Sequence, residues 1–240
     1  MRKIFIDCGA NNGCSTNKFI KRFPNSEDYE IYMFEANPKG CTKYIEKIID
    51  KYPDNNITYI PQAVWINEDG VDVFDVTCKG SNNIFEEGNQ YKKSSTYKVK
   101  STHLSKWIKS NFSKDDYIVL KLDIEGSEYN IIEDLYKTDI LSYINEIHGE
   151  LHGIKKGFNI NDDLKLLETM KKYNLEFFAW NGENIDKPIK TIDDVGYTVD
   201  HIEGEYNKWE NRKKFKCVPD WKTLEKYKNN YKEWYDENME

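Results

Sequence analysis

Three short apolar runs of this chain end in acidic residues of the kind that bind ligands or move protons. Residues 4–13 read IFIDCGANNG, residues 30–38 read EIYMFEANP, and residues 117–128 read YIVLKLDIEGSE. Apolar runs of this length, bounded by turn residues, are typical of buried strands. Because ligands of an open α/β sheet bind at the carboxyl ends of its strands, these acids are predicted to line a ligand site.

The first run leads into a glycine turn and then a helix start. Asp7 ends the predicted strand, Gly9 lets the chain turn and a ligand approach the backbone, and Gly13 lets the helix begin close to the strand. Ser15 and Thr16 mark the beginning of that helix. The spacing D-x-G-x-x-x-G differs from the dinucleotide pattern G-x-G-x-x-G, and an ordinary tight turn is the alternative interpretation.

Glu35 closes the second run, where a second parallel strand should finish. A carboxylate at that place can accept two hydrogen bonds from a ribose diol, as in nucleotide-binding α/β folds. The alternative is a surface carboxylate at a strand end. A dinucleotide-dependent dehydrogenase is disfavoured, because Glu35 follows Asp7 at a longer interval than the roughly 20 residues expected there.

Together these motifs resemble those of the FkbM family of methyltransferases. In that family a D-x-G-A-N-x-G loop, an F-E-x-N-P turn and a K-x-D-x-E-G-x-E segment occur in this order, here at residues 7–13, 34–38 and 121–128. The ELH of residues 150–152 resembles the E-x-H that follows the fifth strand in many relatives. The resemblance covers about residues 3–153. It implies a Rossmann-like class I α/β fold, with a mostly parallel sheet, helices on both faces and a late antiparallel strand.

The resemblance also implies S-adenosylmethionine as the methyl donor, bound along the carboxyl edge of the sheet. It favours a position for Asp123 beside the methyl group, where the carboxylate could contact the donor's amino group or the acceptor hydroxyl. The candidate donor-binding residues are Asp7, Gly9, Ala10, Asn11, Gly13, Ser15, Glu35, Ala36, Asn37, Ala63 and Asp123.

Methyl transfer from a sulfonium is an in-line displacement, so much of the acceleration can come from positioning the two reactants. A hydroxyl acceptor must also lose its proton. His152 is the best candidate base, because its unperturbed pKa of about 6.5 suits proton transfer near neutral pH. Glu150 could orient the imidazole or bind the acceptor. Lys121 shares a strand face with Asp123 and could either reach the site or pair structurally with an acid.

A divalent cation is an open possibility for the same region. Hard oxygen ligands with one imidazole suit magnesium or manganese, although spacing alone does not make the ligands converge. His148, as a strand residue, is expected to pack in the core instead. The residues that could take part are Asp123, Glu125, Glu128, Glu150 and His152.

Length and composition favour a single enzyme domain over residues 1–240, with a core to about residue 205 and an aromatic helix over about 220–238. The net charge of −7 argues against a strong nucleic-acid footprint. No run approaches the roughly 18 apolar residues of a membrane helix, so a cytoplasmic protein without membrane contact is expected. The cysteines at positions 8, 14, 41, 78 and 217 show no metal-like spacing and are expected to be free thiols.

Strands and helices alternate through the first two-thirds of the chain. The polar stretch 78–95 is either a mobile loop over the site or a disordered surface loop. The aromatic stripe in 220–238 is expected to pack on the domain, with a sugar platform or a dimer contact as alternatives. Helices are expected at about 15–23, after Pro38, around 104–108 and around 131–135, and strands at 57–65, 71–74, 97–100, 117–123, 143–150, 177–180 and 215–218.

The sequence therefore favours an O-methyltransferase that acts on a hydroxyl group, most plausibly of a sugar or another glycan. The carbohydrate rests on what FkbM relatives often do. The alternatives are a 2′-O-methyltransferase of an RNA ribose or cap, which the acidic net charge disfavours, and a catalytically inactive protein that keeps the fold as a scaffold.

Overall fold

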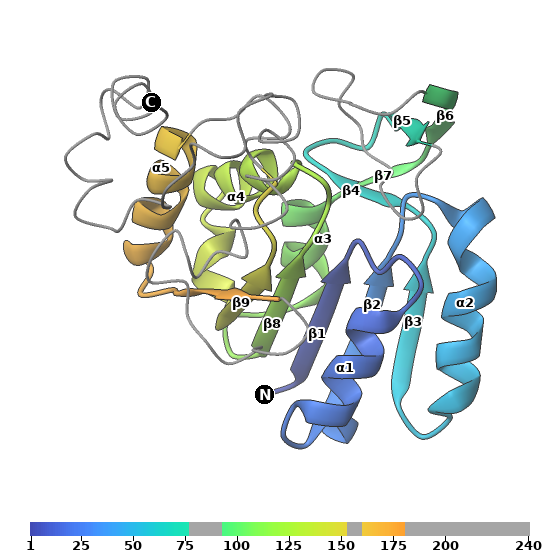
Figure 1. The fold of residues 1–240 in the computed structure, drawn as a ribbon. Coiled ribbons are helices and arrows are strands. Elements are labelled where there is room, and N and C mark those ends of the chain that lie inside the picture. Colours follow the sequence, from blue (N-terminus) through green and yellow to red (C-terminus); the bar gives the residue numbers. More distant parts are fainter. Residues whose placement is uncertain (77–92, 153–159, 181–240) are drawn as a thin grey trace, which may run out of the picture.

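The computed structural model of the chain describes residues 1–76, 93–152 and 160–180 (Figure 1). Its centre is a sheet of six strands in the order β10-β9-β8-β1-β2-β3, and every neighbouring pair runs parallel. This confirms the predicted Rossmann-like α/β fold with a parallel sheet. The strands are β1 (Lys3–Cys8), β2 (Tyr29–Phe34), β3 (Asn56–Ile60), β8 (Tyr117–Leu122), β9 (Glu146–Gly149) and β10 (Phe177–Ala179).

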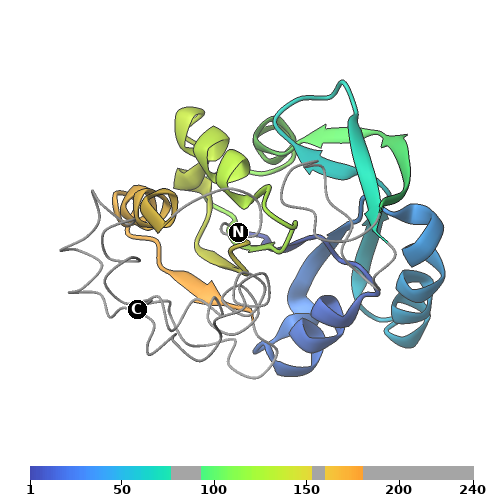
Figure 2. The same ribbon diagram turned by 45° about the horizontal axis from the view of Figure 1, so that its top comes forward.

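Helices cover both faces of this sheet (Figure 1 and Figure 2). One face packs against α1 and α2, and the other packs against α3, α4 and α5, so the sheet separates two apolar clusters. Within the described part of the chain, no helix is both long and apolar enough to cross a membrane. The helices are α1 (Cys14–Arg22), α2 (Pro38–Lys51), α3 (Leu104–Asn111), α4 (Glu128–Lys137) and α5 (Ile160–Lys171), with short 3-10 turns at η1 (Ser26–Asp28) and η2 (Ile140–Tyr143).

The apolar spacing of the first two helices explains how they pack. On α1, Phe19 is buried and stacks on Phe5 of β1 with ring centroids 3.8 Å apart. On α2, Cys41 and Ile45 are buried. Tyr44 lies at the edge of that apolar stripe and is 43% exposed.

The strand expected at 57–65 is divided in two. β3 ends at Ile60, and the chain then turns away so that β4 (Ala63–Trp65) pairs with β7 (Ser101–His103) outside the main sheet. Pro61 lies at the break, and a proline has no N–H to continue a ladder. Figure 1 shows these two strands beyond the carboxyl ends of β1 to β3.

The strands expected at 71–74 and 97–100 form an antiparallel pair outside the main sheet. β5 (Val71–Val76) pairs with β6 (Lys93–Val99), whose first residues belong to the stretch expected to be a loop. The rest of that stretch, residues 78–92, lies outside the described residues. The predictions for 215–218 and for a helix at 220–238, and with them the extent of the single domain, also lie outside.

The last described strand differs from the prediction. The strand expected at 177–180 is β10, which pairs parallel with β9, with Phe177 opposite Ile147, and so does not supply the late antiparallel strand. The intervening α5 explains this direction, because a strand-helix-strand crossover returns the chain in the same sense. The strand expected over 143–150 is also shorter, since residues up to Tyr143 form η2 and β9 begins at Glu146.

Gly9 is needed for close approach of two backbones. Its φ is +84°, and a Cβ added there would lie 1.9 Å from the backbone oxygen of Asp123. The glycine is therefore required by the close approach of the backbone at the end of β8. The sequence alone instead suggests the approach of a ligand as the reason for Gly9. Gly9→Ala is expected to lower the free energy of unfolding by about 1–3 kcal/mol, measured by urea denaturation.

Gly40→Ala serves as the control for this substitution. A Cβ at Gly40 would meet the side chain of Asn37 at 2.8 Å, and a side chain can move where a backbone oxygen cannot. A loss of stability in Gly9→Ala no larger than in Gly40→Ala would contradict the assigned role of Gly9.

Candidate active site

The carboxyl ends of β1, β2, β8 and β9 bring the sequence motifs together. From β1 the chain builds the sheet outward in one direction to β2 and β3, and it later returns to the other side of β1 with β8, β9 and β10. The boundary between β1 and β8 is the switch point at which open α/β sheets bind ligands. Backbone hydrogen bonds link the strand ends, from Asp123 N to Cys8 O at 3.1 Å and from Glu150 N to Leu122 O at 3.0 Å.

Glu35 holds the loop after β1 against the loop after β2. Its carboxylate accepts hydrogen bonds from the backbone N–H of Asn11 at 2.7 Å and from that of Asn37 at 2.6 Å. The side chain is 7% exposed, and this burial raises the pKa of the carboxyl group. The ribose contact predicted from the sequence therefore involves a carboxylate that already orders both loops.

Asp7 and Lys121 form a fully buried ion pair under the same loop. The distance from Lys121 Nζ to Asp7 Oδ1 is 3.1 Å, and Thr16 of α1 donates a hydrogen bond to Asp7 at 2.8 Å. Lys121 also donates to the backbone oxygen of Gly9 at 2.9 Å and lies 3.4 Å from Asp123. Burial by itself would lower the pKa of Lys121, but the carboxylates of Asp7 and Asp123 outweigh it and raise the pKa. The structure thus favours the structural pairing of Lys121.

The other donor-binding candidates lie on the loops around this pair. A Cβ at Gly13 would lie 2.6 Å from Ile48, so this glycine allows α1 to start close to α2. Asn37 accepts a hydrogen bond from Gly40 N and caps α2. Ala10 is buried in the cluster beneath α1 and α2, and Ser15 lies in the first turn of α1.

Two further candidates lie apart from the loop after β1. Ala63 is buried with Val71 and Val73 in a small cluster, against which Ala36 packs. Ala63 belongs to β4, so it reaches this cluster from outside the main sheet. The described structure brings together the motif residues and explains their packing, and their contacts with a donor remain predictions.

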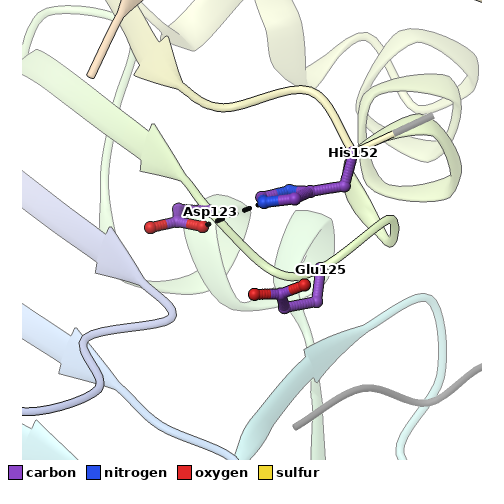
Figure 3. A group of neighbouring side chains, drawn as sticks. All are labelled: Asp123, Glu125 and His152. Atoms are coloured by element: carbon purple, nitrogen blue, oxygen red, sulfur yellow. Dashed lines mark ion pairs between the residues drawn. The ribbon is translucent and has the colours of Figure 1, made fainter. Parts of the chain in front are cut away.

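His152 is 4% exposed and is oriented by Glu128. Its Nδ1 lies 3.0 Å from Glu128 Oε1, while its Nε2 lies 3.8 Å from Asp123 Oδ1 and 3.7 Å from Glu150 Oε2. Figure 3 shows the imidazole extending toward Asp123, with Glu125 beside it. Glu128 is therefore at hydrogen-bonding distance from the imidazole, whereas Glu150, which the sequence suggested for this role, is farther away.

Glu128 is the residue whose role sequence reasoning missed. It is fully buried at the first position of α4 and accepts hydrogen bonds from the backbone N–H of Ile124 at 2.7 Å and of Gly126 at 2.8 Å. The available signal was its place as an acid at a helix N-terminus, where carboxylates pair with exposed N–H groups. The loop that it ties down includes Glu125, whose φ is +56°.

The surrounding carboxylates change the charge of the site. Burial by itself would lower the pKa of His152, but the nearby charges of Glu125, Glu128 and Asp123 outweigh it and raise the pKa to about 10. Burial and the charge of Asp123 raise the pKa of Glu150 to about 7. The unperturbed value used in the sequence argument therefore does not describe His152, which carries a proton at neutral pH in this structure.

The remaining histidine and cysteine predictions concern the core. His148 is 2% exposed, with its Nε2 3.0 Å from Glu146, and it stacks on Phe178, as expected for a packing residue. Cys8 and Cys41 are buried free thiols, and burial together with Glu35 raises the pKa of Cys41 to about 12. The cysteines at 78 and 217 lie outside the described residues, while the thiol at 14 is free and exposed.

Comparison with known proteins identifies the family. No curated protein and no solved structure matches the chain significantly. The model of the methyltransferase FkbM domain matches residues 7–177, from the last part of β1 to the start of β10. That match contains all the motifs described above. It also extends past residue 153, where the motifs recognised in the sequence end. The chain therefore belongs to the FkbM methyltransferase family.

Proposed function

We propose that this protein is an S-adenosylmethionine-dependent O-methyltransferase that acts on a hydroxyl group of a sugar or another glycan. The observation that carries the proposal is the position of Glu35, Asp123, Glu150 and His152 at the carboxyl ends of β2, β8 and β9, on one edge of the sheet. Membership of a methyltransferase family gives the class of reaction. The donor, the acceptor and the transfer to oxygen are the parts that we propose.

The residues at this edge fit the proposed donor. Glu35 ends β2 beside the glycine loop, which is the place of a ribose-binding acid in α/β folds. The side chain of Asp123 is 27% exposed and offers a carboxylate to a ligand that carries sulfonium and ammonium groups. S-adenosylmethionine supplies the methyl group, which passes to the acceptor oxygen as the carbon–sulfur bond breaks and S-adenosylhomocysteine is left.

The protein must also take up the proton that the acceptor hydroxyl loses. Glu150 lies beside His152 beyond β9 and faces Asp123, so its carboxylate is placed to receive that proton, while the protonated imidazole of His152 lies next to it. Glu128 keeps the imidazole in its orientation. Lys121 and Asp7 remain beneath the site and hold the loop between them, which makes them positioning residues in this proposal.

The chemistry of the site supports a neutral, hydroxyl-rich acceptor. Carboxylates accept hydrogen bonds from sugar hydroxyls and repel phosphate groups, and the chain has a net charge of −7. This is the reason to place a glycan before an RNA ribose or cap. The inactive scaffold is less well supported, because the predicted acids and His152 are all present and ordered around one edge of the sheet. We also propose that the protein is cytoplasmic and that residues 1–240 form one domain.

Isothermal titration tests the donor. We expect micromolar binding of S-adenosylmethionine and S-adenosylhomocysteine and no binding of NAD. Glu35→Ala should raise both dissociation constants about tenfold or more, because the loop N–H groups of Asn11 and Asn37 lose their common acceptor.

Glu30→Ala is the matched control for this titration. Glu30 belongs to the same strand and pairs with Arg2, away from the carboxyl edge, so its loss should leave donor binding unchanged. Failure of the folded wild-type chain to bind either adenosyl ligand would favour the scaffold interpretation.

A further inference from the structure

We propose that Asp123, Glu125 and His152 form a binding site for a divalent cation of the magnesium or manganese type. This inference rests on the proposed function, since it adds a metal to the same site. The three residues come from the end of β8, the loop before α4 and the segment after β9, and they meet at one point (Figure 3).

The ligand atoms are close enough to share one ion. One carboxylate oxygen from each acid and one imidazole nitrogen all lie within 4.8 Å of one another. Atoms bound to a common ion at about 2.0–2.3 Å lie at most about 4.6 Å apart, so shifts of a few tenths of an ångström bring these three into coordination. Nε2 of His152 is 3.8 Å from Asp123 Oδ1, which is longer than a hydrogen bond and suits two ligands of the same ion.

The histidine is held in the manner of a metal ligand. Its Nδ1 lies 3.0 Å from Oε1 of Glu128, a fully buried carboxylate that two backbone N–H groups also hold in place. Such a carboxylate–histidine pair fixes the imidazole orientation, and a metal ion would bind Nε2 by displacing the proton from this nitrogen. Because the Glu128 carboxylate already binds the imidazole and these two N–H groups, it positions the metal ligands and is not itself one of them.

The charge around this point also favours a cation. Four carboxylates, those of Asp123, Glu125, Glu128 and Glu150, surround His152. Besides His152, the cation that the described residues bring to these carboxylates is Lys121, which lies near Asp123 and also pairs with Asp7. A divalent ion would offset this excess of negative charge.

The ligand types indicate the ion. Two carboxylates and one imidazole suit manganese or magnesium, with water or the acceptor in the remaining positions. An acceptor hydroxyl on the ion would lose its proton more readily. Glu150 is outside the ligand set, and its side chain is 45% exposed, so it can take that proton.

Manganese is the probe for the test, used on the full-length chain after treatment with EDTA. We expect saturable binding in a titration followed by electron paramagnetic resonance, with one ion per chain and displacement by excess magnesium. Glu125→Gln should raise the dissociation constant of manganese at least tenfold. Spin-echo modulation from a coordinated imidazole nitrogen should be present in the wild type and lost in His152→Ala.

Glu133→Gln is the matched control. It makes the same change on the outer side of α4, where Glu133 pairs with Lys137, and it should leave manganese binding unchanged. Absence of manganese binding by the folded wild-type chain would overturn the inference. So would an affinity that Glu125→Gln does not alter, or a bound ion without a nitrogen signal.

Titration of S-adenosylmethionine in EDTA separates the two proposals. Donor binding by a chain that does not bind manganese would overturn the metal site and leave the proposed function standing. Manganese binding with the expected variant effects, by a chain that binds no adenosyl ligand, would support the site and overturn the proposed donor.

Discussion

Replacing Glu150 with glutamine is expected to lower kcat for methyl transfer by about 10²- to 10⁴-fold, with little change in donor binding. Glutamine keeps the shape of the side chain but cannot accept the acceptor's proton. Glu150 lies 3.7 Å from His152 and is half-exposed, so it can reach both the buried imidazole and a bound acceptor. The measurement is single-turnover transfer from S-adenosylmethionine to a hydroxylated sugar that shows a gain of methyl mass.

Two comparisons show whether Glu150 acts in the chemical step. Glu133→Gln, on the exposed side of α4, should leave kcat unchanged. His152→Ala should also lose most turnover and retain donor binding, and the double variant should lose far less than the product of the two effects, because the residues act as a unit. Wild-type turnover in Glu150→Gln would remove this residue from proton transfer, and wild-type turnover in His152→Ala would remove the histidine from the mechanism.

Replacing Lys121 with methionine is expected to lower the free energy of unfolding by about 3–5 kcal/mol. Methionine fills similar space but leaves Asp7 as a buried charge that has lost its cation. Both side chains are fully buried, so solvent cannot stabilise the remaining carboxylate. The Gly9 carbonyl also loses the donor that holds the loop after β1. Urea denaturation followed by circular dichroism measures the effect.

The double variant Asp7→Asn/Lys121→Met tests the cause of this loss. Removing both charges should recover part of the stability, because the cost lies in the uncompensated charge more than in the lost attraction. Lys137→Met is the control, since that lysine pairs with Glu133 on the surface and should change stability by less than about 1 kcal/mol. A similarly small loss in Lys121→Met would contradict a charged, buried pair.

The sequence by itself was sufficient for the parallel α/β arrangement, for the loops that bear Asp7, Glu35 and Asp123, and for the family. These features depend on local patterns. Apolar runs mark buried strands, glycine and proline mark turns, and the carboxyl ends of parallel strands share one edge of the sheet. The two wrong strand predictions also have local causes. Pro61 breaks the ladder of the strand expected at 57–65, and the preceding helix sets the direction of β10.

Only the tertiary structure decided which of these side chains pair and what charge they carry. Lys121 meets the Gly9 carbonyl across 112 residues of sequence, and Glu128 meets His152 across 24. The facing carboxylates then outweigh the effect of burial and raise the pKa of His152 far above the value of a free imidazole. Both pairing and pKa depend on distances between segments that are remote in the chain and on the solvent that folding excludes, and no local pattern of residues records either quantity.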